Sequence, residues 1–265
     1  MSQNIKISIL LPVHNGELTL EKSIISVLEQ THKNLELVII NDASRDTTSE
    51  ILKKYSKIDR RIKVINNCDR KGITKSLNIG INHATGEYIA RQDADDYSSP
   101  KRLSLQLQKC NETGFDVCFG TACIVDIENN KKHKSEFVYD KDIFLNYLKK
   151  FKNPFVHGTL LIKSKLIREY FYNEKYLYFQ DFELWNRLLE NNKFCFVKNT
   201  IYFCLKHNNS ISYRRINVSF NNFIGQQINY LLIAVKVFKY HKIIPFGYFK
   251  FFLYKVVQFT KYKIN

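Results

Sequence analysis

The residues best suited to chemistry in this 265-residue sequence are three carboxylates, Asp93, Asp95 and Asp96, which directly follow a short apolar run. An unpaired carboxylate is costly to bury, so we expect the cluster to lie where a buried strand leaves its sheet. Asp93 and Asp95 are two residues apart and can face the same side of an extended segment. Two such oxygen ligands suit Mg²⁺ or Mn²⁺, and these ions bind diphosphates. The alternative is a solvated acidic loop, because an isolated Asp-x-Asp pair is a weak motif.

The segment that leads to these acids alternates predicted strands and helices. Apolar runs predict strands over 5–13, 35–40, 62–65 and 88–90, and helical periodicity predicts helices over 18–30, 47–55 and 73–83. This alternation with short links predicts a parallel sheet with right-handed crossovers. The carboxyl ends of its strands share one edge, so Asp42 should lie on the same edge as Asp93 and Asp95.

The chain beyond residue 100 has a less regular pattern. Helices are predicted over 100–110, 141–150 and 181–190, and strands over 115–125 (interrupted at Gly120), 159–162, 194–197 and 201–205. The polar segment 126–135 is predicted to be a turn.

Composition restricts the class of protein. The net charge is +16, and every charged side chain from 191 to 265 is Lys or Arg, so this end should attract an anionic surface. Six cysteines without a Cys-x-x-Cys pair, and a start without a secretory signal, predict reduced thiols in a cytoplasmic protein. No apolar run approaches the ~20 residues of a spanning helix.

Residues 216–265 form a predicted basic, aromatic helical extension. Helices are expected over 223–240 and 248–261, separated by a Pro-Phe-Gly break. Lysines mixed with aromatic residues on such helices are typical of a segment that lies on a membrane surface. The alternative is an ordinary extension that packs on the core or on a second copy in a homo-oligomer.

Several segments together resemble the family 2 glycosyltransferases over about residues 5–210. The matching segments are ISILLPVHNGE, LELVIINDASRDTT, KGITKSLNIGI, ATGEYIARQDADD, NPFVHGTLLIKS and QDFELWNRLL. The resemblance implies an α/β protein with the GT-A nucleotide-diphospho-sugar transferase fold, which has a mostly parallel central sheet flanked by helices. That domain would cover residues 1–215, followed by the C-terminal helical extension.

The resemblance also implies a nucleotide pocket and a metal site. The nucleotide-binding residues would be Pro12, Val13, His14, Asn15, Glu17, Asp42, Lys71, Asp93 and Ala94. Asp42 would hydrogen-bond the base, commonly uracil, and Asp93 would contact the ribose or the water shell of the metal. Asp95 would ligate the Mn²⁺ or Mg²⁺ that bridges the diphosphate, and His207 would lie near the metal.

On the acceptor side, Asp181 matches the catalytic base of the family and His157 a histidine of the acceptor loop. Gln180 and Trp185 would line or support this side. From the residues alone, Asp181 could instead cap a helix. His157 could simply support its loop, and Trp185 could be a core residue rather than one that stacks on the acceptor.

Two positions depart from the family pattern. His14 stands where an aromatic residue is usual, which should alter stacking on the base. Gln180 replaces the usual Glu before the catalytic Asp, and the loss of that charge should leave Asp181 with a more ordinary pKa.

These features predict an inverting glycosyltransferase that uses a nucleotide-diphosphate sugar, with UDP as the usual nucleotide. The acceptor would be a surface glycan or lipid-linked oligosaccharide, and the enzyme would bind the inner face of the cell membrane. The alternative is a catalytically silent nucleotide-sugar-binding or membrane-associated scaffold of the same fold. Nucleic acid is not an expected partner, because the predicted site is acidic rather than basic and aromatic.

Overall fold

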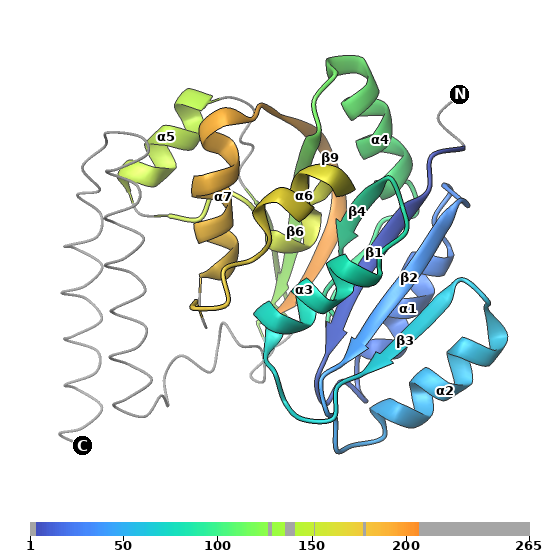
Figure 1. Cartoon of the computed structure of the whole chain (residues 1–265). Helices are drawn as coiled ribbons and strands as arrows, with labels where there is room; N and C mark the ends of the chain where they lie inside the picture. The colour runs from blue at the N-terminus through green and yellow to red at the C-terminus, as the bar shows by residue number, and fades with distance from the viewer. Residues whose placement is uncertain (1–3, 127–128, 136–140, 151, 177–178, 207–265) are drawn as a thin grey trace, which may run out of the picture.

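The computed structural model describes residues 4–126, 129–135, 141–150, 152–176 and 179–206. A nine-stranded sheet with the order β3-β2-β1-β4-β8-β6-β9-β5, and with β7 paired to β6, organises these residues (Figure 1). His207 and the predicted extension over 216–265 lie outside the described residues.

The first half of the chain forms the parallel part of the sheet. Its elements are β1 (Ile7–Val13), α1 (Leu20–Leu28), β2 (Leu35–Asn41), α2 (Thr48–Ile58), β3 (Ile62–Asn66), α3 (Ile73–His83) and β4 (Tyr88–Arg91). β1 lies between β2 and β4 and is parallel to both, while β3 is parallel to β2. The predicted alternation of strands and helices is confirmed, because apolar runs that are buried on both faces mark parallel strands clearly.

The second half extends the sheet with mixed strand directions. Its elements are β5 (Tyr97–Ser98), α4 (Arg102–Thr113), β6 (Val117–Asp126), β7 (Lys131–Lys134), α5 (Lys141–Lys149), the 3₁₀ helix η2 (His157–Thr159), β8 (Leu161–Lys163), α6 (Ser164–Tyr170), α7 (Gln180–Asn191) and β9 (Phe194–Lys206). β8 is antiparallel to both β4 and β6, and β6 is parallel to β9.

Three boundaries in this half differ from those predicted. The strands expected over 194–197 and 201–205 are one strand, β9, because it pairs with β6 along its length. β6 is likewise continuous, and the interruption expected at Gly120 is a shift in register between Gly120 and Ala122. The polar segment 126–135 contains β7, whose residues are all exposed and therefore lack the alternation that would mark a strand.

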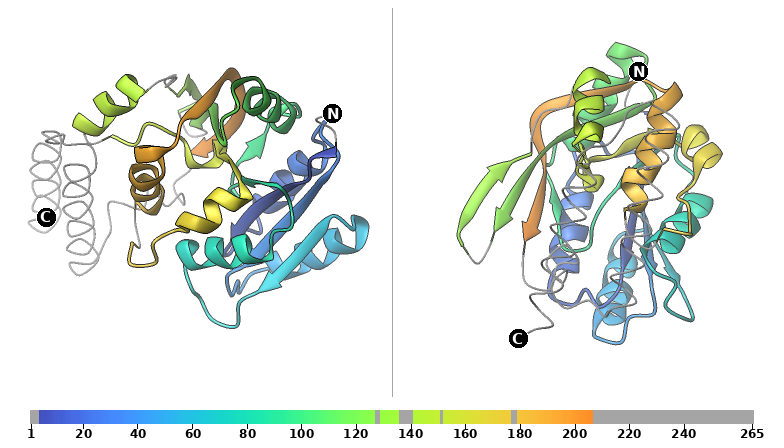
Figure 2. Two further views of the ribbon diagram at one scale, coloured as in Figure 1. Left: turned by 45° about the horizontal axis from the view of Figure 1, so that its top comes forward. Right: turned by 90° about the vertical axis from the view of Figure 1, so that its left-hand side faces the viewer.

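Helices cover both faces of the sheet (Figure 2). Side chains of α3, α6 and α7 pack in one apolar core, on the face toward the viewer in Figure 1. Those of α1, α2 and α4 pack in a second core on the opposite face. The sheet is therefore the middle of three layers, which leaves the ends of its strands for a site.

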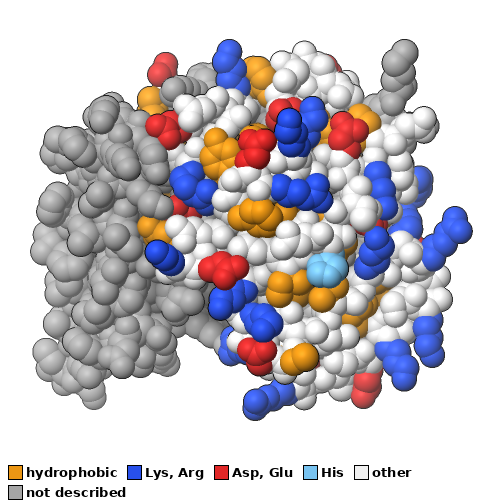
Figure 3. Space-filling view, in the orientation of Figure 1, with side chains coloured by type: hydrophobic (Ala, Val, Ile, Leu, Met, Phe, Trp, Pro, Cys, Tyr) orange, Lys and Arg blue, Asp and Glu red, His pale blue; other side chains and the backbone are white. Residues whose placement is uncertain are grey.

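The surface of the described residues carries charge of both signs. Lys and Arg side chains are spread over the face shown in Figure 3, with Asp and Glu between them. None of the described helices is long and apolar enough to cross a membrane.

Candidate active site

A cavity of about 400 Å³ opens at the carboxyl ends of β1, β2 and β4. It is lined by Pro12, Val13, His14, Asn15, Gly16, Thr19, Asp42, Arg70, Gly72, Ile73, Ser76, Asp93, Ala94 and Asp95. The structure therefore brings together the residues predicted from the end of the first strand, from Asp42 and from the acidic cluster. The shared edge follows from the parallel order of these strands.

Two loops at this edge are hydrogen-bonded to each other. Asn15 receives the backbone N–H of Arg45 on its Oδ1 at 2.9 Å, and its own N–H donates to Ser44 Oγ at 3.0 Å. Glu17 accepts from both the backbone N–H and the hydroxyl of Thr47, at 3.2 and 2.9 Å. Glu17 is not among the residues that line the cavity, and its carboxylate holds the loop before α2 in place. Its contact with the nucleotide stays a prediction.

Asp42 is buried and fixes the loop before α3. Its Oδ1 accepts from the N–H of Lys71 and from Asn67 Nδ2, and its Oδ2 accepts from the N–H of Gly72, each at 2.8 Å. Burial acts to raise the pKa of Asp42, but these hydrogen bonds outweigh it and leave the pKa below its usual value. A charged acceptor is thus held at the cavity wall, with capacity left on Oδ2 for a ligand donor.

Lys71, predicted to bind the nucleotide, makes two contacts beside the cavity. Its backbone N–H binds Asp42, but its ammonium group pairs with Asp69 at 2.9 Å rather than lining the cavity. The neighbouring Arg70 lines the cavity instead, and within the described part of the chain no hydrogen bond or ion pair of its guanidinium is found. Arg70 could have been found from the sequence, because it is a basic residue next to the loop that Asp42 holds.

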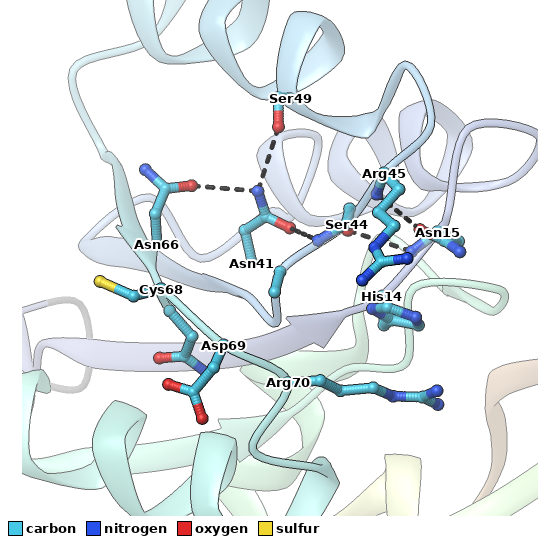
Figure 4. A pocket seen from close by; sticks show the side chains of 12 residues that line it. His14, Asn15, Asn41, Ser44, Arg45, Ser49, Asn66, Cys68, Asp69 and Arg70 are labelled. Atoms are coloured by element: carbon cyan, nitrogen blue, oxygen red, sulfur yellow. Dashed lines mark hydrogen bonds between the residues drawn. The ribbon is translucent and has the colours of Figure 1, made fainter.

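A second cavity of about 890 Å³ adjoins the first and shares His14, Asn15 and Arg70 with it. Figure 4 shows its lining, in which Asn41 donates to Asn66 Oδ1 at 3.0 Å. His14 places its Nδ1 2.7 Å from the carbonyl oxygen of Asp42, so Nδ1 is the protonated nitrogen. The amide and imidazole groups give this space hydrogen-bonding partners on both sides.

A buried arginine holds the acidic cluster in place. Arg91 is 2% exposed and its Nη2 lies 2.5 Å from Asp93 Oδ1. The backbone N–H of Asp93 donates to the Tyr202 hydroxyl oxygen at 2.9 Å. Asp93 is therefore held by protein groups, while Asp95 lines the cavity beside it.

Asp96, the third acid, has a structural position. It is buried, and its Oδ1 accepts the backbone N–H of Leu205 at 2.9 Å. Burial, followed by the charges of Asp93 and Asp95, raises the pKa of Asp96 well above its usual value. Asp96 thus joins the acidic segment to β9.

Asp181 is the second residue of α7, whose cap position is Phe179. Its Oδ1 accepts the N–H of Phe182 and its Oδ2 accepts from Asn153 Nδ2, both at 2.7 Å. Burial raises the pKa of Asp181, and the charge of Asp93 acts in the same direction. The absence of a carboxylate at Gln180 therefore does not leave Asp181 with an ordinary pKa, because burial outweighs the hydrogen bonds from Phe182 and Asn153 that lower it.

The other residues predicted on the acceptor side are Gln180, His157 and Trp185, and each has a different environment. Gln180 precedes it as the first residue of α7 and is half-buried. His157 lies 2.7 Å from the Tyr172 hydroxyl, and burial lowers the pKa of its imidazole, which keeps the ring neutral. Trp185 is fully buried against His157 and Phe119, so it is a core residue that supports this side and cannot stack on an acceptor.

The acids of the cavity fit a divalent cation held at an open site. Asp93 and Asp95 supply carboxylate oxygens, the ligand type that Mg²⁺ and Mn²⁺ prefer. Within the described ranges, no third His, Cys or carboxylate ligand groups with them closely enough to complete a protein cage. Mg²⁺ commonly keeps waters and binds through one or two carboxylates and substrate phosphates, so this donor set is sufficient.

Two further residues of this site escaped sequence reasoning. Asn153 binds Asp181 across 28 residues of sequence, and Tyr202 binds Asp93 across 109. The Asn-Pro pair before the histidine loop was a weak signal for Asn153. Tyr202 lies within an ordinary apolar strand, and its sequence offers no signal.

The fold and the acidic edge of the sheet define the GT-A class of nucleotide-diphospho-sugar transferases. Staphylococcus aureus TarS 1–349 in complex with UDP-GlcNAc shares the fold with a TM-score of 0.70 and 20% identity, over 88% of this chain and 67% of that one. Mannosyltransferase PcManGT from Pyrobaculum calidifontis, in complex with GDP-Man and Mn²⁺, gives 0.61 and 18% over 88% and 64%.

The chain belongs to glycosyl transferase family 2, whose model matches residues 8–203. It is 29% identical over 217 residues to UDP-Glc:alpha-D-GlcNAc-diphosphoundecaprenol beta-1,3-glucosyltransferase WfgD of Escherichia coli, covering 82% of this chain and 81% of that protein. Three other curated relatives are longer than the matching region, since the chain spans 59, 69 and 65% of their lengths.

Proposed function

We propose that this glycosyltransferase moves a sugar, with inversion, from a nucleotide-diphosphate sugar to a hydroxyl of a surface glycan or lipid-linked oligosaccharide. UDP is the proposed nucleotide. The observation that carries the proposal is one cavity lined by Asp42, Asp93 and Asp95. Asp181 lies outside this lining, at the start of α7, and the charge of Asp93 contributes to its raised pKa. The name of WfgD, which specifies UDP-Glc and a diphosphoundecaprenol-linked acceptor, supports the substrate class.

The donor would bind along the edge of the sheet. Asp42 and His14 would offer an acceptor and a ring edge to the nucleoside, and the exposed Arg70 would meet the phosphates. Asp95, with Asp93 beside it, would hold Mn²⁺ or Mg²⁺, and this ion supplies positive charge for the departing diphosphate. The Mn²⁺ in the PcManGT complex supports this choice of metal.

Asp181 would accept the proton of the acceptor hydroxyl as that oxygen attacks the sugar. A raised pKa makes its carboxylate a stronger base than an ordinary aspartate. Asn153 and the N–H of Phe182 orient the carboxylate for this transfer. A single base that acts on the face opposite the leaving group gives inversion, as in inverting glycosidases.

The basic C-terminal part of the sequence is proposed to hold the enzyme at the inner face of the membrane. All charged side chains from 191 onward are cationic, which favours anionic lipid headgroups. Flotation of the full chain with anionic vesicles should be efficient at low salt and weak at high salt. Equal flotation with neutral vesicles would contradict this electrostatic attachment.

A thermal-shift panel tests the donor proposal. UDP-Glc, UDP-GlcNAc and GDP-Man are each added with Mn²⁺ or with a chelator. A ligand at 100 times its Kd should stabilise the protein by about 2.7 kcal/mol, and we expect this for a UDP-sugar only with the metal. Asp95→Asn should lose the metal-dependent part, and the control Asp116→Asn, a surface carboxylate paired with Lys163, should retain it.

Two results would overturn the assignments. Stabilisation by GDP-Man and not by UDP-sugars would exclude UDP as the nucleotide. Donor binding without transfer to any lipid-linked or glycan acceptor, in a chain that keeps Asp95 and Asp181, would favour the silent scaffold of the same fold.

A further inference from the structure

Three of the six cysteines meet in the interior, outside the linings of the two cavities at the acidic edge. Cys110 lies in the last turn of α4, and Cys118 of β6 is directly paired in register with Cys195 of β9. The sulfur atoms of Cys110 and Cys195 are 3.9 Å apart, and all three lie within 4.8 Å of one another. Their side chains are buried, so three separate elements direct thiols to one point.

This spacing is close to that of a thiolate metal site. With Zn–S bonds of about 2.3 Å and tetrahedral angles, two sulfur ligands lie about 3.8 Å apart. The observed 3.9 Å between the sulfur atoms of Cys110 and Cys195 matches this separation. A donor set made only of sulfur selects soft thiophilic ions and rejects Mg²⁺ and Mn²⁺, which separates this cluster chemically from the acidic cavity.

We propose that Cys110, Cys118 and Cys195 form a three-thiolate binding site for Zn²⁺, with the fourth position taken by a ligand from solvent. On binding, three S–H bonds break and three Zn–S bonds form. The three protons go to solvent, so the ion with its charge of +2 becomes a filled site of net charge −1. Binding must consequently strengthen as the pH rises.

A groove supplies the path to this site. Cys195 also lines a surface groove of about 810 Å³ between α4 and β9, together with Lys109, Thr113 and Lys198. The groove leaves room for the fourth ligand next to Cys195.

The position of the cluster indicates what a bound ion would do. It would fasten α4 to β6 and β9. α4 carries Arg102, which donates to the carbonyl of Arg91 at 2.8 Å, and Gln106, which donates to the carbonyl of Thr159 at 2.7 Å. These contacts hold the acidic segment and η2 against α4. The ion would therefore be structural and would make the part of the fold that supports the active site more rigid.

Titration of the reduced full chain tests the proposal, with Cd²⁺ as a spectroscopic probe and Zn²⁺ in competition. We expect one ion per chain, a thiolate-to-Cd²⁺ charge-transfer absorption that Zn²⁺ removes, and affinity that rises with pH. Cys118→Ser and Cys195→Ser should each weaken metal binding by more than ~10–100-fold. That range is typical for substitution of residues that hold the metal ligands in place but do not bind the metal. The matched control Cys68→Ser removes an exposed thiol and should change nothing.

If Cys118→Ser does not fold, Cys195→Ala at the edge of the groove gives the same test, with the half-buried Cys204→Ala as its control. The proposal is overturned if the reduced chain shows no thiolate absorption with Cd²⁺. It is also overturned if that absorption persists in Cys118→Ser or Cys195→Ser but disappears in Cys68→Ser or Cys204→Ala.

Discussion

Asp181 is subject to opposing influences that suit it to accept a proton. Burial and the charge of Asp93 raise its pKa, while hydrogen bonds from the N–H of Phe182 and from Asn153 lower it. The balance lies above the ordinary aspartate value, so the carboxylate is a stronger base but needs a higher pH to be ionised. Asn153 is therefore the residue that tunes this base, although it takes no proton itself.

Asn153→Ala should move the acidic limb of the kcat/KM profile to higher pH. The substitution removes the donor 2.7 Å from Asp181 Oδ2, and with it an influence that lowers the pKa of Asp181. At pH 7 the rate should fall by less than the ~10²-fold that marks the loss of general base catalysis. Asn129→Ala, which removes a surface amide near Asp126, is the control, and equal profiles for both variants would contradict the role of Asn153.

Asp181→Asn should make the protein more stable at neutral pH. A folded-state pKa above the unfolded value of about 3.9 means that the folded state binds the proton more tightly, so stability falls as the pH rises through this window. Removal of the carboxylate abolishes that loss. The melting temperature of the variant should exceed that of the parent at pH 7 and approach it at pH 4; a lower melting temperature at pH 7 would contradict the burial cost.

Among the elements, β9 connects the acidic segment with the histidine loop. Tyr202 of β9 receives the N–H of Asp93 and packs under η2 so closely that a Cβ added at Gly158 would lie 2.2 Å from its ring. Leu205 of the same strand binds Asp96. β9 thus fixes the position of Asp93 and Asp96 relative to the loop that carries His157.

Tyr202→Phe should loosen this connection with little loss of fold. The ring and its packing remain, but the N–H of Asp93 loses its acceptor, which costs about 0.5–1.5 kcal/mol of unfolding free energy. Metal-dependent donor binding should weaken in the same variant. Tyr170→Phe removes a hydroxyl whose one hydrogen-bond partner within the described ranges is Asn192 at 3.2 Å, and it should leave donor binding intact.

Local pattern predicted some of these elements and not others. β1 to β4 and the meeting of Asp42 with Asp93 and Asp95 followed from apolar runs and parallel order. Glu17 and Lys71 were predicted to bind the nucleotide. The structure shows contacts of these side chains with Thr47 and Asp69 that the sequence pattern did not indicate. β9 was divided in two because its continuity depends on β6, which is distant in sequence.

At the scale of the whole molecule, the acids at the two edges of the parallel sheet have different roles. The carboxyl edge holds acids that face a cavity, whereas the amino edge holds the buried Glu36. Glu36 accepts from Ser8 Oγ at 2.5 Å and from the N–H of Thr85 at 2.6 Å, and pairs with Lys63 at 2.7 Å. These contacts join β1, β2, β3 and the turn before β4.

Glu36→Gln should destabilise the fold by about 1.5–3 kcal/mol, the value of hydrogen bonds to a charged group. Burial acts to raise the pKa of Glu36, but the hydrogen bonds from Lys63, Ser8 and Thr85 hold it well below its usual value. Its contribution is therefore complete above the unfolded pKa of about 4.3 and declines as the pH falls below it. Urea unfolding at pH 7 and pH 3 measures this, with Glu50→Gln, at an exposed position of α2, as the control.

The most direct measurement of the central claim is single-turnover transfer by Asp181→Asn, with donor binding recorded on the same sample. The account predicts that this variant binds a UDP-sugar with Mn²⁺ as the parent does and transfers the sugar at least ~10²-fold more slowly. Normal transfer by Asp181→Asn would contradict the assignment of the base and, with it, the convergence of donor and acceptor chemistry on this edge of the sheet.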